Sequence, residues 1–120
     1  MQEESSLRMD TADGVTLVGF RDASILDMNT IQRVSRELYR LVEAGDRPSV
    51  VLDFSGVRFL SSQALGVLLT LRRKADAASV RVVLVGLRPE LARVFRIANL
   101  DKLFVFFDTR EAAIAHFNPQ

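Results

Sequence analysis

The stretch that decides the fold spans residues 50–67: Val50-Val51-Leu52-Asp53-Phe54-Ser55-Gly56-Val57-Arg58-Phe59-Leu60-Ser61-Ser62-Gln63-Ala64-Leu65-Gly66-Val67. Its first five residues are almost all apolar and begin with β-branched side chains, which is typical of a central strand buried on both faces. A helix-forming run begins at Ser62, so Ser61 and Ser62 lie where a strand is followed by a helix N-terminus. Unpaired backbone N–H groups and the helix dipole favour negative charge there, and a phosphate on either hydroxyl would find hydrogen-bond donors.

Upstream of this stretch, the sequence predicts a hairpin and a helix. Leu7–Asp10 alternates apolar and polar residues as an edge strand does, Ala12-Asp13-Gly14 favours a turn, and Val15–Phe20 forms the second arm. The segment from Arg21 to Met28 has no regular pattern. The helix that follows has Asn29 as its expected N-cap, with Gln32 three residues later. Its apolar face comprises Ile31, Val34, Leu38, Leu41 and Val42.

Downstream, the pattern continues with alternating helices and strands. The second helix is expected over Ser62–Ala75, and the strand Val80–Val85 follows it. Pro89 fits the first position of a third helix, because its fixed φ suits a helix start. A last strand is expected over Leu103–Phe107. Asp108 and Glu111 have the spacing of a capping pair for a short final helix.

The resulting element order, β-β-α-β-α-β-α-β-α, predicts a single α/β domain. Strands joined through helices should be parallel with right-handed crossovers, and the leading hairpin should add an antiparallel edge to a mixed sheet with helices mainly on one face. We expect Asn29 and Ser62 at the same edge of the sheet, because helices that follow parallel strands begin at their carboxyl ends. The predicted core combines Val51, Leu52, Val83, Leu84 and Leu38.

Composition favours a soluble cytoplasmic domain. The 120 residues suffice for one core, and the apolar and charged fractions, 48% and 26%, are those of ordinary globular proteins. A net charge of +1 gives no basis for binding nucleic acid or an acidic membrane. The chain has no cysteine, and no apolar run approaches the roughly 20 residues of a spanning helix. We expect residues 1–5 to form a flexible tail, and no cofactor or metal.

Several segments in order resemble the STAS domain, the family of bacterial anti-sigma factor antagonists and of the cytoplasmic tails of sulfate transporters. They are Asp53–Val57 with Phe59–Val67, the Leu26-Asp27 stretch, the segment from Leu84 to Phe95, and Asn99–Phe104. The resemblance covers nearly the whole chain and implies a STAS domain over residues 6–118. The family's signature after the central strand is an acidic residue, Ser or Thr, a small residue and Gly. Here these positions hold Ser61, Ser62, Gln63 and Ala64, and Leu65-Gly66-Val67 then agrees with the family.

The resemblance implies a non-catalytic regulatory module that switches partners. In the family, the unphosphorylated domain binds a GHKL-type serine kinase that is also an anti-sigma factor, so that a sigma factor is released. The kinase phosphorylates the serine and binding is lost, and a PP2C-type phosphatase restores it. Carried over to this chain, the phosphoacceptor is Ser62, with Ser61 as the alternative. The expected partner-binding residues are Ser61, Ser62, Gln63, Gly66, Arg21, Asp27 and Asn29.

Other interpretations of these residues stay open at this point. Ser61 and Ser62 could simply cap the helix in a constitutive structural subunit of a transport or signalling assembly. Asp53 ends a strand as the phosphoacceptor of a receiver domain does, but that site also needs an acidic pair and a lysine, for which the chain offers Asp10, Asp13 and Lys102. A hydrolase triad of Ser62 with His116 lacks a G-x-S-x-G motif, and His116 is expected to be solvated. The basic residues Arg72, Arg73, Lys74, Arg93 and Arg96 are expected on solvated helix faces.

Overall fold

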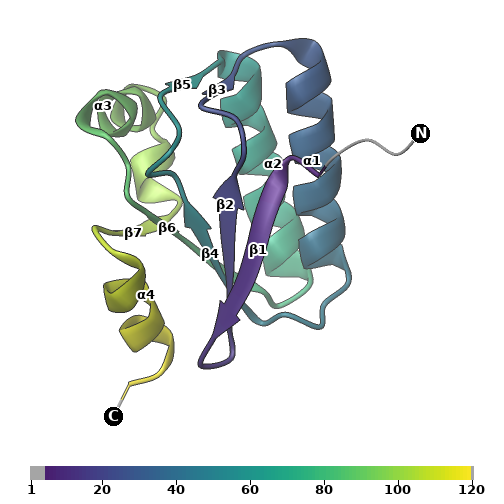
Figure 1. The fold of residues 1–120 in the computed structure, drawn as a ribbon, viewed down its shortest axis with the longest axis vertical. Helices are drawn as coiled ribbons and strands as arrows, with labels where there is room; N and C mark the ends of the chain where they lie inside the picture. The colour runs from purple at the N-terminus through teal and green to yellow at the C-terminus, as the bar shows by residue number, and fades with distance from the viewer. Residues whose placement is uncertain (1–4, 120) are drawn as a thin grey trace.

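The computed structural model describes residues 5–119, which form an α/β domain (Figure 1). The strands are β1 (Leu7–Ala12), β2 (Val15–Phe20), β3 (Ser24–Ile25), β4 (Ser49–Asp53), β5 (Phe59–Leu60), β6 (Arg81–Val85) and β7 (Val105–Phe107). The helices are α1 (Met28–Glu43), α2 (Ser62–Ala77), α3 (Pro89–Ile97) and α4 (Arg110–Phe117), with a 3₁₀ turn at Leu100–Lys102. After this 3₁₀ turn the chain turns again at Leu103 and bends at Phe104, so the last strand is shorter than the predicted Leu103–Phe107.

Five strands form a mixed sheet in the order β1-β2-β4-β6-β7. The β1–β2 pair is antiparallel and the other neighbours are parallel, so the predicted hairpin and crossovers are confirmed. Asp13 and Gly14 form the two-residue hairpin loop with φ of 52° and 79°. Positive φ at both positions matches the twist of the flanking strands. As predicted, β4 is the central strand, and Val50, Val51 and Leu52 have no exposed surface.

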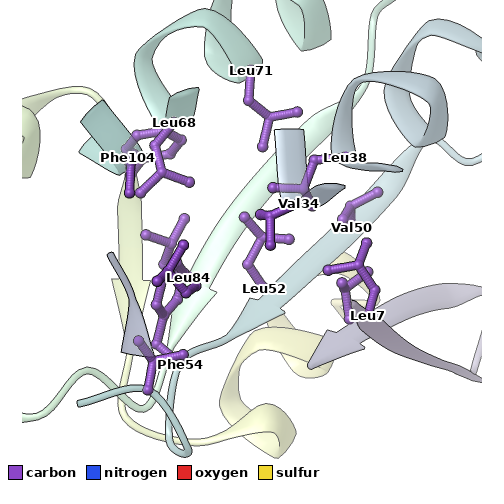
Figure 2. Close-up of a cluster of buried hydrophobic side chains, with 14 of the residues drawn as sticks. Leu7, Val34, Leu38, Val50, Leu52, Phe54, Leu68, Leu71, Leu84 and Phe104 are labelled. Atoms are coloured by element: carbon purple, nitrogen blue, oxygen red, sulfur yellow. The ribbon is translucent and has the colours of Figure 1, made fainter. Parts of the chain in front are cut away.

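The sheet has two buried faces, and this corrects the prediction of one core. Side chains of α1 and α2 pack on one face with Leu52 and Leu84 (Figure 2). Leu91 and Phe95 of α3 belong to the same cluster. Val51 and Val83 point to the opposite face, because successive side chains alternate across a strand. There they form a second cluster, which α4 covers with the buried Ala113. Three helices therefore cover one face and a single short helix covers the other.

Two helix caps differ from those predicted. Helix α1 begins one residue after Asp27, whose carboxylate accepts hydrogen bonds from the backbone N–H and the hydroxyl of Thr30, at 3.1 and 2.7 Å. Asn29 therefore lies in the first turn and is not the cap. At α4, Thr109 and not Asp108 is the cap, and its hydroxyl accepts from Ala112 N at 3.1 Å.

The segment from Arg21 to Met28 is more regular than its sequence suggests. It contains β3, which pairs in parallel with β5 in a separate two-stranded sheet, with Ser24 opposite Phe59 and Ile25 opposite Leu60. A two-residue strand is too short to show an alternating pattern, so sequence periodicity does not reveal it. At the start of the chain, residues 1–4 of the expected tail lie outside the described residues, and the Ser5 hydroxyl bonds to the Glu37 carboxylate on α1.

Candidate functional site

The N-termini of α1 and α2 lie side by side, because the segments before them are joined through their backbones (Figure 1). The backbone N–H of Ser61 donates to the carbonyl of Ile25 at 3.1 Å. On the same pair of segments, the N–H groups of Arg58 and Phe59 both donate to the carbonyl of Ala23, at 2.7 and 3.2 Å. Both helix starts thus occupy the carboxyl-terminal edge of the parallel strands. The structure places Asn29 and Ser62 together at this edge.

The two adjacent serines have different environments. Ser61 is the N-cap of α2, is half-buried, and accepts a hydrogen bond on its hydroxyl from Ala64 N at 3.1 Å. Ser62 is the first helical residue and is exposed. Its hydroxyl has no hydrogen-bond partner within residues 5–119. Of the two hydroxyls, that of Ser62 is therefore the more accessible to an external reactant.

The next residues of α2 divide between surface and core. Gln63 and Gly66 are exposed, whereas Ala64 is buried and packs in the main core. Gly66 lies in the helix interior, its φ is not positive, and a Cβ built on it would meet no atom within 4 Å. Glycine in a helix interior costs about 0.8–1.0 kcal/mol relative to alanine. The fold therefore does not require glycine at position 66.

The loop residues expected in the partner surface lie at the same edge. Arg21, Asp27 and Asn29 are all exposed. The Asp27 carboxylate caps α1, and its hydrogen bonds from the side chain and the backbone of Thr30 hold the pKa of this carboxyl below its ordinary value. It therefore keeps its negative charge throughout the neutral range. The backbone N–H of Arg21 donates to the carbonyl of Ser6, which ties the start of this loop to the residue before β1.

Three exposed hydrophobic residues extend this surface and were not predicted from the sequence. Leu26 and Met28 flank the α1 cap, and Phe59 lies in β5, with exposed fractions of 50%, 52% and 56%. Exposed large apolar side chains that gather at one place on a domain mark interaction surfaces. The sequence did contain a signal for their exposure. Leu26 and Met28 flank Asp27, and a charged side chain favours a segment that lies at the surface. We call the exposed residues at the two helix starts the helix-start surface: Leu26, Met28, Phe59, Ser62, Gln63 and Gly66.

Asp53 holds the turn that leads from β4 toward this surface. It is 9% exposed and accepts hydrogen bonds from the backbone N–H of Ser55, at 2.9 Å, and from the guanidinium of Arg110. Burial by itself raises the pKa of the Asp53 carboxyl, but these hydrogen bonds outweigh it and hold the pKa below its ordinary value. Gly86 lies against the same turn with φ of 72°, and a Cβ there would approach Asp53 Oδ1 to 3.1 Å.

The structure does not assemble the alternative sites considered from the sequence. Asp13 lies in the β1–β2 turn, at the opposite end of the sheet from Asp53 (Figure 1). His116 lies at that far end too, where its Nε2 is 3.1 Å from Arg81 Nη2, so it cannot act with Ser62. Within residues 5–119, no group of three or more His, Asp or Glu side chains could hold a metal ion. In the same part of the chain, no helix has the length and apolar character required to cross a bilayer.

Comparison with known proteins agrees with the geometry. Residues 6–113 match the family model of the STAS domain. This chain belongs to the STAS domain family. A protein of Bordetella bronchiseptica described as a candidate anti-sigma factor antagonist, BtrV, is 30% identical over 111 residues, covering 92% of this chain and 93% of BtrV.

Solved STAS structures share the fold. An anti-sigma factor antagonist from Mycobacterium paratuberculosis superposes with a TM-score of 0.80 at 26% identity, over 93% of this chain and 92% of that one. The anti-sigma factor antagonist SpoIIAA, in its unphosphorylated form, superposes with a TM-score of 0.78 at 16% identity, over 95% of this chain and 97% of SpoIIAA. A structure of the phosphorylated form of SpoIIAA, from Bacillus, has a TM-score of 0.69 at 18% identity, over 92% and 98% of the two chains.

The departures of this STAS domain from the family signature can now be interpreted in its structure. Ser61 occupies the N-cap of α2, a position at which serine and aspartate are equally favoured, so serine preserves the cap that an acidic residue would supply. Ala64 replaces glycine at a buried position and fills space in the core. Gln63 is exposed and is free to vary without cost to the fold.

Proposed function

We propose that this STAS domain is a non-catalytic regulatory module that binds another protein through the helix-start surface and is released by phosphorylation of Ser62. The observation that carries the proposal is the state of the Ser62 side chain. It is exposed at the first position of α2, and its hydroxyl has no partner within the described residues. The neighbouring Ser61 hydroxyl is engaged in the cap, so Ser62 is the acceptor that a kinase can reach.

Phosphorylation at this position would cost the fold little. The first turn of α2 contains no acidic side chain, and the N–H groups at a helix start donate readily to anions. A negative group near a helix N-terminus is stabilised by up to about 2 kcal/mol. The same group adds roughly two negative charges and the bulk of a phosphate to a surface that also presents Phe59. The modification would therefore change binding much more than it changes folding.

The proposed partners are those that the family resemblance implies, and the relatives named as anti-sigma factor antagonists support an anti-sigma factor among them. The partner of the unphosphorylated form is a GHKL-type serine kinase that acts as an anti-sigma factor, and a PP2C-type phosphatase reverses the modification. Both reactions take place in the cytoplasm. The domain supplies a surface and an acceptor hydroxyl, and catalysis belongs to its partners. Neither nucleic acid nor a membrane takes part in the interaction.

The test is a binding measurement with purified proteins. Each GHKL-type serine kinase encoded in the source genome is titrated with the wild-type domain, Ser62→Ala and Ser62→Asp by calorimetry. We expect one kinase to bind the wild type and Ser62→Ala alike, and Ser62→Asp at least roughly tenfold more weakly, since a buried unpaired charge weakens an interface. Ser79→Asp adds the same charge beyond the other end of α2 and serves as the control. Equal binding of wild type and Ser62→Asp would instead favour a constitutive structural subunit.

A further inference from the structure

A second recess adjoins the helix-start surface, between β5 and α3. It is a pocket of about 430 Å³ lined by Arg58, Phe59, Leu60, Arg88, Glu90, Leu91 and Val94. Phe59 belongs to both features, since it is part of the helix-start surface and also lines the pocket. Leu60 lies two residues before Ser62 in the chain. A protein that covers Ser62 and Phe59 therefore also reaches the opening of this pocket.

Arg88 lines this pocket, and its side chain has an unmet requirement for a hydrogen bond. Its side chain is half-buried, and its Nε atom is buried without a hydrogen-bond partner among the described residues. Arg88 precedes Pro89 in extended conformation at the N-cap of α3, and it makes no capping bond with its side chain. A guanidinium offers only hydrogen-bond donors, so this side chain requires acceptors. Leaving a buried donor unsatisfied is unfavourable, and a turn of the Arg88 side chain toward an acceptor in the pocket would remove that penalty.

The rest of the pocket defines the chemistry of the missing acceptor. Arg58 is exposed on the β5 side, and within residues 5–119 neither Arg58 nor Arg88 forms an ion pair. Glu90 is the one acid in the lining, so the pocket carries a net positive charge. Leu91 and Val94 form an apolar wall, which suits the methylene groups of an aliphatic side chain. Two arginines beside an apolar wall match a carboxylate on a short aliphatic stem.

We propose that this pocket receives an acidic side chain, glutamate or aspartate, from the protein that binds the helix-start surface. This inference rests on the proposed function, because it concerns the same partner. The half-buried Arg88 holds the carboxylate and sets the lifetime of the complex. The exposed Arg58 attracts it during approach. The contact surface then extends from Ser62 across Phe59 to α3. At one end the partner contacts the unmodified Ser62, and at the other end the pocket receives the partner's carboxylate.

The first experiment tests the pocket without the partner. The domain labelled with ¹⁵N is titrated with N-acetylglutamate amide, up to tens of millimolar, while the Arg88 Nε–Hε signal and the backbone amides of Phe59 and Leu91 are followed by NMR. We expect shifts at these three sites that Arg88→Gln abolishes, and no shifts with N-acetylglutamine amide. Glu90→Gln should bind the acidic probe a few-fold more tightly, because it removes the opposing charge. Absence of shifts at all three sites, or equal shifts with the glutamine probe, overturns the proposal.

The second experiment measures kinase binding by surface plasmon resonance. Arg88→Gln should weaken binding roughly tenfold through faster dissociation, and Arg58→Gln a few-fold through slower association that depends on salt. Arg93→Gln removes an exposed charge from the same helix outside the pocket and should bind as wild type does. The thermal midpoint of Arg88→Gln should equal or exceed that of wild type, since the substitution removes an unsatisfied charge.

The outcomes separate the two proposals. If Ser62→Asp weakens binding and Arg88→Gln does not, the pocket proposal fails and the proposed function stands. If no kinase binds but the acidic probe does, the proposed function fails and the pocket stands as a carboxylate site. A lower thermal midpoint for Arg88→Gln, together with unchanged binding kinetics, would give Arg88 a structural role and overturn the proposal.

Discussion

Gly66→Ala should stabilise the domain and weaken partner binding at the same time. Gly66 is exposed in the interior of α2, and a Cβ at this position would meet no atom within 4 Å. Alanine is favoured over glycine in a helix interior by about 0.8–1.0 kcal/mol, so the free energy of unfolding should rise by that amount. In a domain of this size the thermal midpoint should increase by about 3–5 °C. If the partner packs closely on the bare helix backbone, the added methyl group should cost about 1–3 kcal/mol of binding, a loss of roughly 5- to 150-fold in affinity.

Calorimetric unfolding and titration with the cognate kinase measure the two effects on the same samples. Gly45→Ala is the matched control, because that residue also lies in open space but has φ of 71°. A side chain is strained at such an angle, so Gly45→Ala should lower stability and leave binding unchanged. Destabilisation by Gly66→Ala would refute the structural argument. Stabilisation with unchanged binding would remove Gly66 from the partner surface.

Three further substitutions test the fold and its electrostatics. Leu52→Asp places a charge without a partner at the centre of the sheet and should cost several kcal/mol, enough to unfold much of the protein in a denaturant titration. Ser61→Ala removes the α2 cap and should lower the free energy of unfolding by about 1 kcal/mol, whereas a loss near zero would contradict the cap. The lowered pKa of Asp53 means that its contribution to stability is present above the ordinary aspartate pKa of about 4 and is lost as the pH falls through the lower folded value. Asp53→Asn should therefore reduce the fall in the free energy of unfolding as the pH drops below about 4. An unchanged dependence on pH would show that the ion pair with Arg110 contributes nothing to it.

The architecture was predictable because its main elements have strong local signals. The run from Val50 to Phe54 is apolar on both faces, as in a central strand. Asp13 and Gly14 are residue types that favour a hairpin turn, and Pro89 begins α3 as expected. The segregation of two cores was not predicted, although it follows from the alternation of Val51 and Leu52 along one strand. Periodicity identifies buried residues in such a strand but does not tell which helix covers which face.

The features that sequence reasoning missed depend on contacts between distant segments. The β3–β5 pairing joins residues more than thirty positions apart and is only two residues long. Both Asp27 and Asn29 are good capping residues, and the hydroxyl of Thr30 favours Asp27 through a second hydrogen bond. The pocket at Arg88 exists only because β5 lies beside α3 in space. Local patterns thus located Ser62 but not the apolar and charged surface around it.

The most direct test of the account is the intact mass of the domain after incubation with the proposed GHKL-type kinase and Mg-ATP. The wild type and Ser61→Ala should each gain one phosphoryl group, and Ser62→Ala should gain none, because the Ser62 hydroxyl is exposed and has no hydrogen-bond partner within residues 5–119. Modification of Ser62→Ala, or an unchanged mass of the wild type with every GHKL-type kinase of the source genome, would contradict the assignment of the switch to Ser62.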